Sequence, residues 1–165
     1  MEAEAKAIAS NNTNNDNRKV QIKKILVPID GSECSLNAAR YAAKLAKDEN
    51  AQVFCIHVIE SVPYYGYVGS PHAIQQYYKD LEEKVQSWFG KVRDIARNEG
   101  ISELKTKTFS DVKSITESII DYAANNNMDL IVIGTRGRTG LKRFLMGSIA
   151  NGVVQHAHCP VLLVR

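Results

Sequence analysis

The chain has 165 residues, of which 44% are hydrophobic and 24% are charged. At roughly 150 residues per domain, this length predicts one domain, and the composition excludes a collagenous, wholly disordered or disulfide-framework protein. The 21 Lys and Arg residues outnumber the 18 Asp and Glu residues by a net charge of only +3, which is too small an excess to indicate a nucleic-acid partner.

Three features of the sequence bear on the compartment. No apolar run approaches the about 20 residues of a membrane-spanning helix, and residues 1–19 lack the apolar core of a signal peptide. Cys34, Cys55 and Cys159 form no close pair, as is typical of free thiols in a reducing compartment. We therefore expect a cytoplasmic protein without a membrane partner.

The chain divides into a tail and one domain. Residues 1–19 are polar and rich in Asn, with little to bury, which predicts a disordered N-terminal tail followed by a domain over 20–165. The predicted elements of that domain, in chain order, are a strand at 24–29, a helix from Ser32 to about 47, a strand at 52–59, a helix at 73–98, a strand at 104–109, a helix marked by Val112, Ile115, Ile119 and Ala123, a strand at 129–133, a helix at 148–155 and a strand at 161–164.

Several elements carry a more specific pattern. The helix at 73–98 has one continuous apolar face, which favours packing on a sheet over a coiled coil. Alternating lysines at 104–109 indicate an exposed edge strand, whereas the apolar run 129–133 is typical of the middle of a parallel sheet. The loop at 61–71 is rich in Tyr, Gly and Pro, and the sequence does not decide between a lid, a partner contact and self-packing.

Strict alternation of strands and helices predicts an α/β fold, a doubly wound parallel sheet with helices on both faces. The runs 25–29 and 129–133 are the most apolar, and we expect them to be central neighbours. Ligands of such sheets bind outside the carboxyl ends of the strands, where the strand order reverses. The turn at 30–32 and the loop at 134–148 should therefore flank one crevice.

The loop at 134–148 has the composition of a phosphate site. It contains four glycines and four cations but no acid, and it runs into a predicted helix N-terminus, where free N–H groups favour anions. The alternative is a solvated loop whose glycines only turn corners. The chain lacks a G-x-x-x-x-G-K-[ST] motif and a G-x-G-x-x-G motif after the first strand, which excludes the Walker and dinucleotide signatures.

At this loop the sequence resembles the ATP-binding branch of the universal stress protein family. The spacing Gly134-x2-Gly137-x9-Gly147-Ser148 carries the resemblance, together with ILVPIDGS at 25–32, DLIVIG at 129–134 and CPVLLVR at 159–165. It spans about residues 23–165. The resemblance implies a single five-stranded sheet of order 3-2-1-4-5, similar to that of the adenine nucleotide alpha hydrolases.

The resemblance also implies roles for residues of this chain. Asp30 would accept hydrogen bonds from the ribose or the adenine edge, at a distance from the phosphates, and Val58 would meet adenine through its backbone. The implied binding residues are Pro28, Ile29, Asp30, Val58, Ile133, Gly134, Arg136, Gly137, Gly147, Ser148, Ile149 and Ala150. Some members carry a hydroxyl residue where Ala150 stands, so one phosphate contact is lost here. Judged from the sequence alone, Asp30 could equally be a turn residue that caps the next helix.

Three functions stay open. The first is a regulatory module that binds ATP, AMP or another adenine nucleotide, with or without Mg²⁺. The second is a slow ATP hydrolase, although no acid of the loop could orient water or a metal, and we assign no catalytic residue. The third is a partner-binding or chaperone-like stress protein that ignores nucleotide.

Two further expectations concern metals and partners. His156, His158 and Cys159 lie close in sequence but do not share a helix face, so we predict no metal site. The apolar strand at 161–164 would lie at a sheet edge, and pairing with its copy would cover it. A homodimer through this strand is also what the family resemblance implies.

Overall fold

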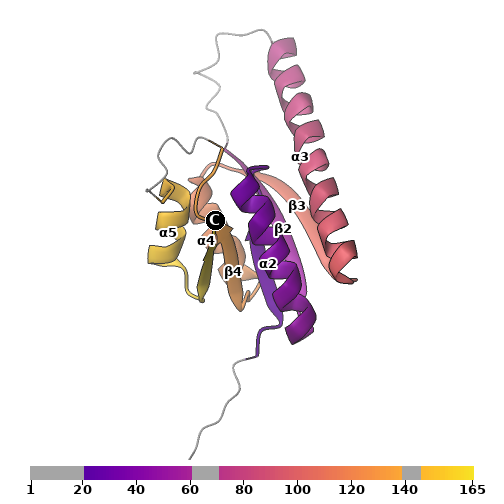
Figure 1. Cartoon of the computed structure of the whole chain (residues 1–165). Coiled ribbons are helices and arrows are strands. Elements are labelled where there is room, and N and C mark those ends of the chain that lie inside the picture. The colour runs from indigo at the N-terminus through magenta and orange to yellow at the C-terminus, as the bar shows by residue number, and fades with distance from the viewer. Residues whose placement is uncertain (1–20, 61–70, 139–145) are drawn as a thin grey trace, which may run out of the picture.

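The predicted strands form one parallel sheet. The computed structural model describes residues 21–60, 71–138 and 146–165, so the predictions for the tail at 1–19 and for the loop up to residue 70 lie outside the described residues. The strands are β1 (Lys24–Pro28), β2 (Gln52–Glu60), β3 (Leu104–Asp111), β4 (Leu130–Gly134) and β5 (Val161–Val164). Their order is β3-β2-β1-β4-β5, which confirms the predicted sheet (Figure 1).

The helices of the described residues cover both faces of this sheet. They are α2 (Glu33–Glu49), α3 (Pro71–Glu99), α4 (Ile115–Asn125) and α5 (Ser148–His156). One hydrophobic cluster joins the sheet to α2 and α3, and a second joins it to α4 and α5. The fold is therefore the three-layer α/β arrangement that the strand and helix alternation predicts.

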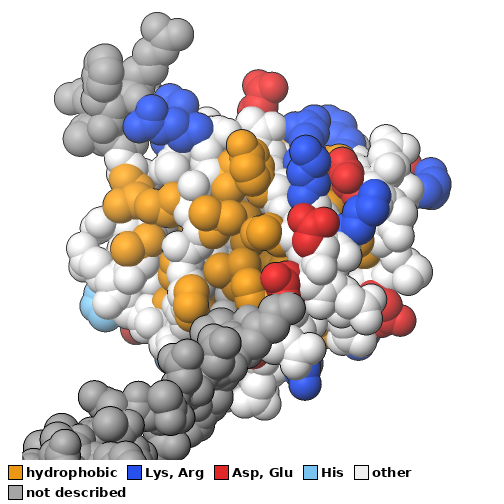
Figure 2. All heavy atoms as spheres, turned by 60° about the horizontal axis from the view of Figure 1, so that its bottom comes forward, with side chains coloured by type: hydrophobic (Ala, Val, Ile, Leu, Met, Phe, Trp, Pro, Cys, Tyr) orange, Lys and Arg blue, Asp and Glu red, His pale blue; other side chains and the backbone are white. Residues whose placement is uncertain are grey.

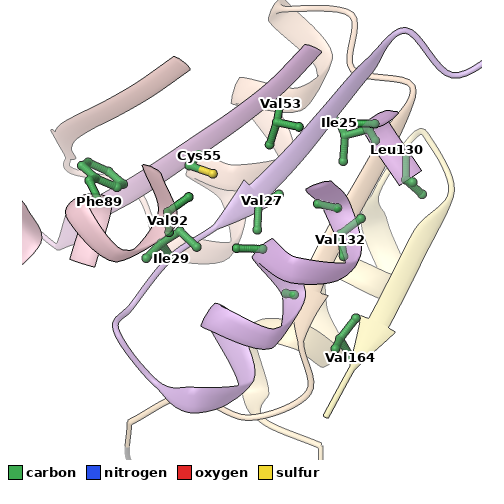
Figure 3. Packing of buried hydrophobic residues seen from close by; sticks show 14 of the residues in the cluster. Ile25, Val27, Ile29, Val53, Cys55, Phe89, Val92, Leu130, Val132 and Val164 are labelled. Atoms are coloured by element: carbon green, nitrogen blue, oxygen red, sulfur yellow. The ribbon is translucent and has the colours of Figure 1, made fainter. Parts of the chain in front are cut away.

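The central strands are β1 and β4, as the sequence predicts. They pair with each other, and their side chains alternate between the two clusters. Ile25 and Val27 face α2 and α3, whereas Leu26 faces the other layer, because successive side chains of a strand point to opposite faces. Figure 3 shows the first cluster, which includes Cys55. Burial raises the pKa of the Cys55 thiol to about 12, so this thiol stays protonated and packs as an apolar group.

Helix α3 packs on the sheet through its C-terminal half. Val85, Phe89 and Val92 are buried in the first cluster, which confirms the prediction that this helix lies on the sheet. Tyr77 and Tyr78, nearer its start, are exposed, and Figure 1 shows that this part of the helix extends beyond the sheet. The apolar face predicted from residues spaced three and four apart passes through Val85 and Val92 but not Phe89, because the buried stripe of the helix is wider than that spacing.

Two of the described helices start at a capping serine. Ser32 is the N-cap of α2, as predicted, and its hydroxyl accepts a hydrogen bond from the Ser35 amide. Ser114 forms a capping box with Glu117 at the start of α4. The prediction that Val112 belongs to this helix is wrong, because Val112 precedes the cap and is 93% exposed.

Candidate functional site

A pocket of about 150 Å³ opens at the carboxyl ends of the central strands. Its walls come from the ends of β1, β2 and β4, from α4 and from the first turn of α5. All of the binding residues that the family resemblance implies line this one pocket: Pro28, Ile29, Asp30, Val58, Ile133, Gly134, Arg136, Gly137, Gly147, Ser148, Ile149 and Ala150. The structure thus brings together residues up to 122 positions apart (150 − 28) in the sequence.

The turn after β1 carries the acidic group of the pocket. One carboxylate oxygen of Asp30, Oδ1, accepts hydrogen bonds from the Ser32 amide at 3.0 Å and from the Ser32 hydroxyl at 2.6 Å. This is the local turn bond that the alternative interpretation of Asp30 predicts. Asp30 also lines the pocket, so the same carboxylate that makes the turn bond is placed where the predicted ligand contact requires it.

The second Asp30 oxygen reaches the loop that follows β4. Oδ2 accepts a hydrogen bond from the Arg138 amide at 3.1 Å. A Cβ atom at Gly137 would lie only 2.8 Å from the same oxygen. The prediction that the turn at 30–32 and the loop after β4 flank one crevice is therefore confirmed, and the Arg138 amide of that loop binds the Asp30 carboxylate directly.

The opposite wall contains the open N-terminus of α5. Gly147 is the N-cap and offers no side-chain hydrogen bond, and no acidic residue lies in the first turn. The Gly147 amide donates to the Thr135 carbonyl at 2.8 Å, which fixes the cap beside the end of β4. The amides of Ser148, Ile149 and Ala150 have no intrahelical partner at this position, so this wall can bind an anion.

Sequence analysis missed part of the pocket lining. The additional residues are Ser35, Ile56, His57, Ile115, Ile119 and Thr135. His57 lies beside the predicted Val58 at the end of β2, and its Nδ1 donates a hydrogen bond to the Ile29 carbonyl at 2.7 Å. The ring also meets Trp88 of α3 edge-on, with 5.3 Å between centroids. No local pattern signals these contacts, since α3 comes from elsewhere in the sequence.

The environment of His57 favours its neutral form. Burial lowers the pKa of His57 and outweighs the hydrogen bond to Ile29, which acts in the opposite direction. Below the ordinary histidine pKa of about 6.5, the unfolded chain therefore binds more protons at this position than the folded chain does.

We expect this histidine to make the fold less stable in acid. Its contribution is constant at neutral pH and falls as the pH drops through about 6.5, where the unfolded state takes up the proton first. In His57→Asn, which keeps a donor for Ile29 and cannot titrate, the melting temperature should fall less between about pH 7.5 and pH 5. Parallel pH profiles for the two proteins would contradict this assignment.

Metal ligands do not gather in the described parts of the chain. Within 21–60, 71–138 and 146–165, no group of three or more His, Cys, Asp and Glu side chains is arranged to hold a metal ion. In the same ranges no helix is both long and apolar enough to cross a bilayer.

Comparisons with known proteins agree with this fold. The sequence pattern of the universal stress protein family matches residues 21–165. A universal stress protein of Methanocaldococcus jannaschii is 39% identical over 145 residues, which is 87% of this chain and 82% of that protein. The solved structure of the universal stress protein UspA from Lactobacillus plantarum superposes with a TM-score of 0.72 at 26% identity, covering 88% of this chain and 99% of that one.

A further solved structure is that of the universal stress protein from Archaeoglobus fulgidus in complex with dAMP. It is 22% identical, with a TM-score of 0.64, and it covers 88% of this chain and 99% of that one.

The fold and the pocket define a doubly wound α/β protein with a pocket, walled in part by an open helix N-terminus, at the point where the strand order reverses. Together with the matching family pattern and the 39% identical relative, they lead to a definite assignment: the chain belongs to the universal stress protein family.

Proposed function

We propose that this protein binds an adenine nucleotide in the pocket and acts as a regulatory module in a stress response. The observation that carries the proposal is the convergence of an apolar wall, one carboxylate and an open helix N-terminus on a single pocket. Those three chemistries match a base, a ribose and a phosphate. The Archaeoglobus fulgidus relative in complex with dAMP shares the fold with this chain and adds support for that choice of ligand.

Different residues of the pocket would bind different parts of the nucleotide. Ile29, Val58 and Ile133 are buried aliphatic residues that suit the flat, apolar faces of a base. Asp30 accepts a hydroxyl hydrogen bond, and the amides of the first turn of α5 take the phosphates, with Arg136 adding positive charge. Free amides together with the Arg136 guanidinium can stabilise more than one phosphate group, so we propose ATP as the main ligand and AMP as a shorter one, each with or without Mg²⁺.

Binding without fast turnover is the form of this function that the site supports. Asp30 is the one acidic residue among the described residues that line the pocket, and its carboxylate already accepts three hydrogen bonds from the protein. Phosphoryl transfer requires a group that orients the attacking water, and usually a held metal. Slow hydrolysis of ATP and nucleotide-independent partner binding are the alternatives. Release of phosphate from ATP would identify the hydrolase.

Calorimetric titration of the full chain with ATP and with AMP tests the proposal. We expect binding heat for the wild type and about tenfold weaker binding for Asp30→Asn, because a hydrogen bond to a charged group contributes roughly 1.5 kcal/mol or more. Asp48→Asn, an exposed charge change on α2, is the control and should bind as the wild type does. No heat at millimolar ATP, with no nucleotide found by mass spectrometry of the purified protein, would refute the proposal.

We also propose that the protein forms a homodimer through β5. This strand ends the sheet, so one of its edges carries no strand of the described chain. Exposed hydrophobic side chains lie on β5 and on the two helices that contact it, namely Leu163, Tyr41 of α2 and Val154 of α5. Figure 2 shows hydrophobic side chains gathered on one face of the molecule, with charged side chains to one side. A second copy related by two-fold symmetry would cover such an edge.

The dimer has a direct test. We expect Leu163→Lys to shift the protein toward monomer in sedimentation velocity, because a charge would be buried at the symmetric contact. Val112→Lys places the same charge on a 93% exposed valine outside β5 and should leave the oligomeric state unchanged. A wild type that sediments as a monomer at all concentrations would contradict the proposal.

The compartment is part of the same proposal. All three cysteines of the chain are free thiols, and they lie in the described residues. Free thiols and an adenine nucleotide ligand both suit the cytoplasm, where thiols are kept reduced.

A further inference from the structure

The single tryptophan of the chain touches the site from outside the pocket. Trp88 lies on α3 and is not among the pocket-lining residues. Its ring covers Gly31 so closely that a Cβ atom there would lie 2.2 Å from the ring atom Cε2. His57 meets the same ring edge-on, so Trp88 is held between the turn after β1 and the end of β2.

Arg138 joins this tryptophan to the pocket. Its guanidinium carbon lies 5.4 Å from the centre of the Trp88 ring, within the range of a cation–π contact. Its backbone amide donates to Asp30 Oδ2. One residue of the loop is thus attached at two points, by its side chain to α3 and by its backbone to the carboxylate of the pocket.

The attachment limits what Asp30 can accept from a ligand. An ionised carboxylate has about four lone-pair positions. Ser32 uses two of them through its amide and its hydroxyl, and Arg138 uses a third. One acceptor position is left, and its direction depends on Arg138 staying where it is.

We propose that Trp88 and Arg138 are positioning residues of the nucleotide pocket, which hold Asp30 and the start of the β4–α5 loop in place for the ligand. The inference rests on the proposed function, because the ligand that they position is the adenine nucleotide. It extends that function to α3, which contributes no residue to the pocket itself. A ligand that binds beside Asp30 and Gly137 changes the surroundings of Arg138, and the indole of Trp88 reports that change.

The experiment uses the full chain, with ATP and AMP as probes. Affinity is measured by calorimetry, and the emission of Trp88 is recorded in the same titration. Arg138→Met removes the charge and keeps the backbone amide, Arg138→Lys keeps a cation over the ring, and Trp88→Leu removes the ring while the arginine stays. Arg93→Met, an exposed charge loss on the same helix, is the control. Circular dichroism melts establish that each variant folds.

We expect Arg138→Met and Trp88→Leu each to weaken ATP binding about two- to fivefold, the range of a partly exposed cation–π contact. Arg138→Lys should retain most of the affinity. The double variant should bind no more weakly than either single one, because the two side chains act as one unit. ATP should change Trp88 emission in the wild type and in Arg93→Met, and much less in Arg138→Met.

Four results would overturn the inference, the first three of them without refuting the proposed function. Additive losses in the double variant would mean that Arg138 only attracts phosphate by its charge. Unchanged affinity in Arg138→Met and Trp88→Leu would remove the positioning role. Binding heat in the wild type without any change in emission would disconnect Trp88 from the pocket while the proposed function stood. Absence of wild-type binding heat would refute the proposed function first, and the inference with it.

Discussion

Gly31→Ala should destabilise the fold much more than the same change at Gly100. Both glycines have left-handed backbones, with φ of +80° and +78°. Only Gly31 is also covered by a ring, because a Cβ atom there would overlap Trp88. A Cβ atom at residue 100 would meet no atom beyond its chain neighbours within 4 Å. The pair therefore separates backbone strain from steric overlap at nearly equal φ.

The expected losses follow from those two terms. We expect Gly100→Ala to lower the free energy of unfolding by about 1 kcal/mol, the strain of a left-handed L-residue. Gly31→Ala should lose a further 1–3 kcal/mol or so, because the ring has to move in a packed position. Urea denaturation measures both values, and in a Trp88→Ala background the difference between the two should shrink. Equal losses at the two positions would mean that Trp88 moves aside without cost.

The strands could be predicted because their signals are local. The apolar run of β1 and the Ser32 cap lie within a few residues of each other, and the structure has both where the sequence places them. The pocket could be predicted for a related reason. In a parallel sheet all carboxyl ends lie at one edge, so identifying β1 and β4 as neighbours brings Asp30 and Gly134 together.

The contacts that sequence analysis missed are those between distant segments. The hydrogen bond between Asp30 and the Arg138 amide spans 108 positions. The place of Trp88 over Gly31 depends on how α3 crosses the sheet, which the periodicity of the helix does not specify. Phe89 was missed for the same reason, because the width of the buried stripe is set by the partner surface.

These missed contacts decide which glycine of the loop matters most. The family spacing treats Gly137 and Gly147 alike, but their surroundings differ. A Cβ atom at residue 147 would meet the Thr135 carbonyl oxygen at 3.5 Å, which is ordinary contact. At residue 137 it would lie 2.8 Å from Asp30 Oδ2, the tip of a short side chain that three hydrogen bonds hold in place.

Gly137→Ala should therefore impair nucleotide binding far more than Gly147→Ala. The added methyl group pushes the loop away from Asp30 and breaks the hydrogen bond from the Arg138 amide. The turn after β1 and the loop after β4 then no longer have the relative position that the ligand requires. We expect a loss of ATP affinity of about tenfold or more, since a hydrogen bond to a charged group is worth roughly 1.5–3 kcal/mol and a tenfold change is about 1.4. Gly147→Ala should stay within about threefold, or roughly 0.7 kcal/mol, because the added methyl group makes only ordinary contacts with the chain and displaces no group of the pocket. Calorimetric titration of the two variants with ATP compares the two losses of affinity directly. A larger loss for Gly147→Ala than for Gly137→Ala would show that close approach of a ligand at residue 147, rather than the Asp30 contact at residue 137, governs binding.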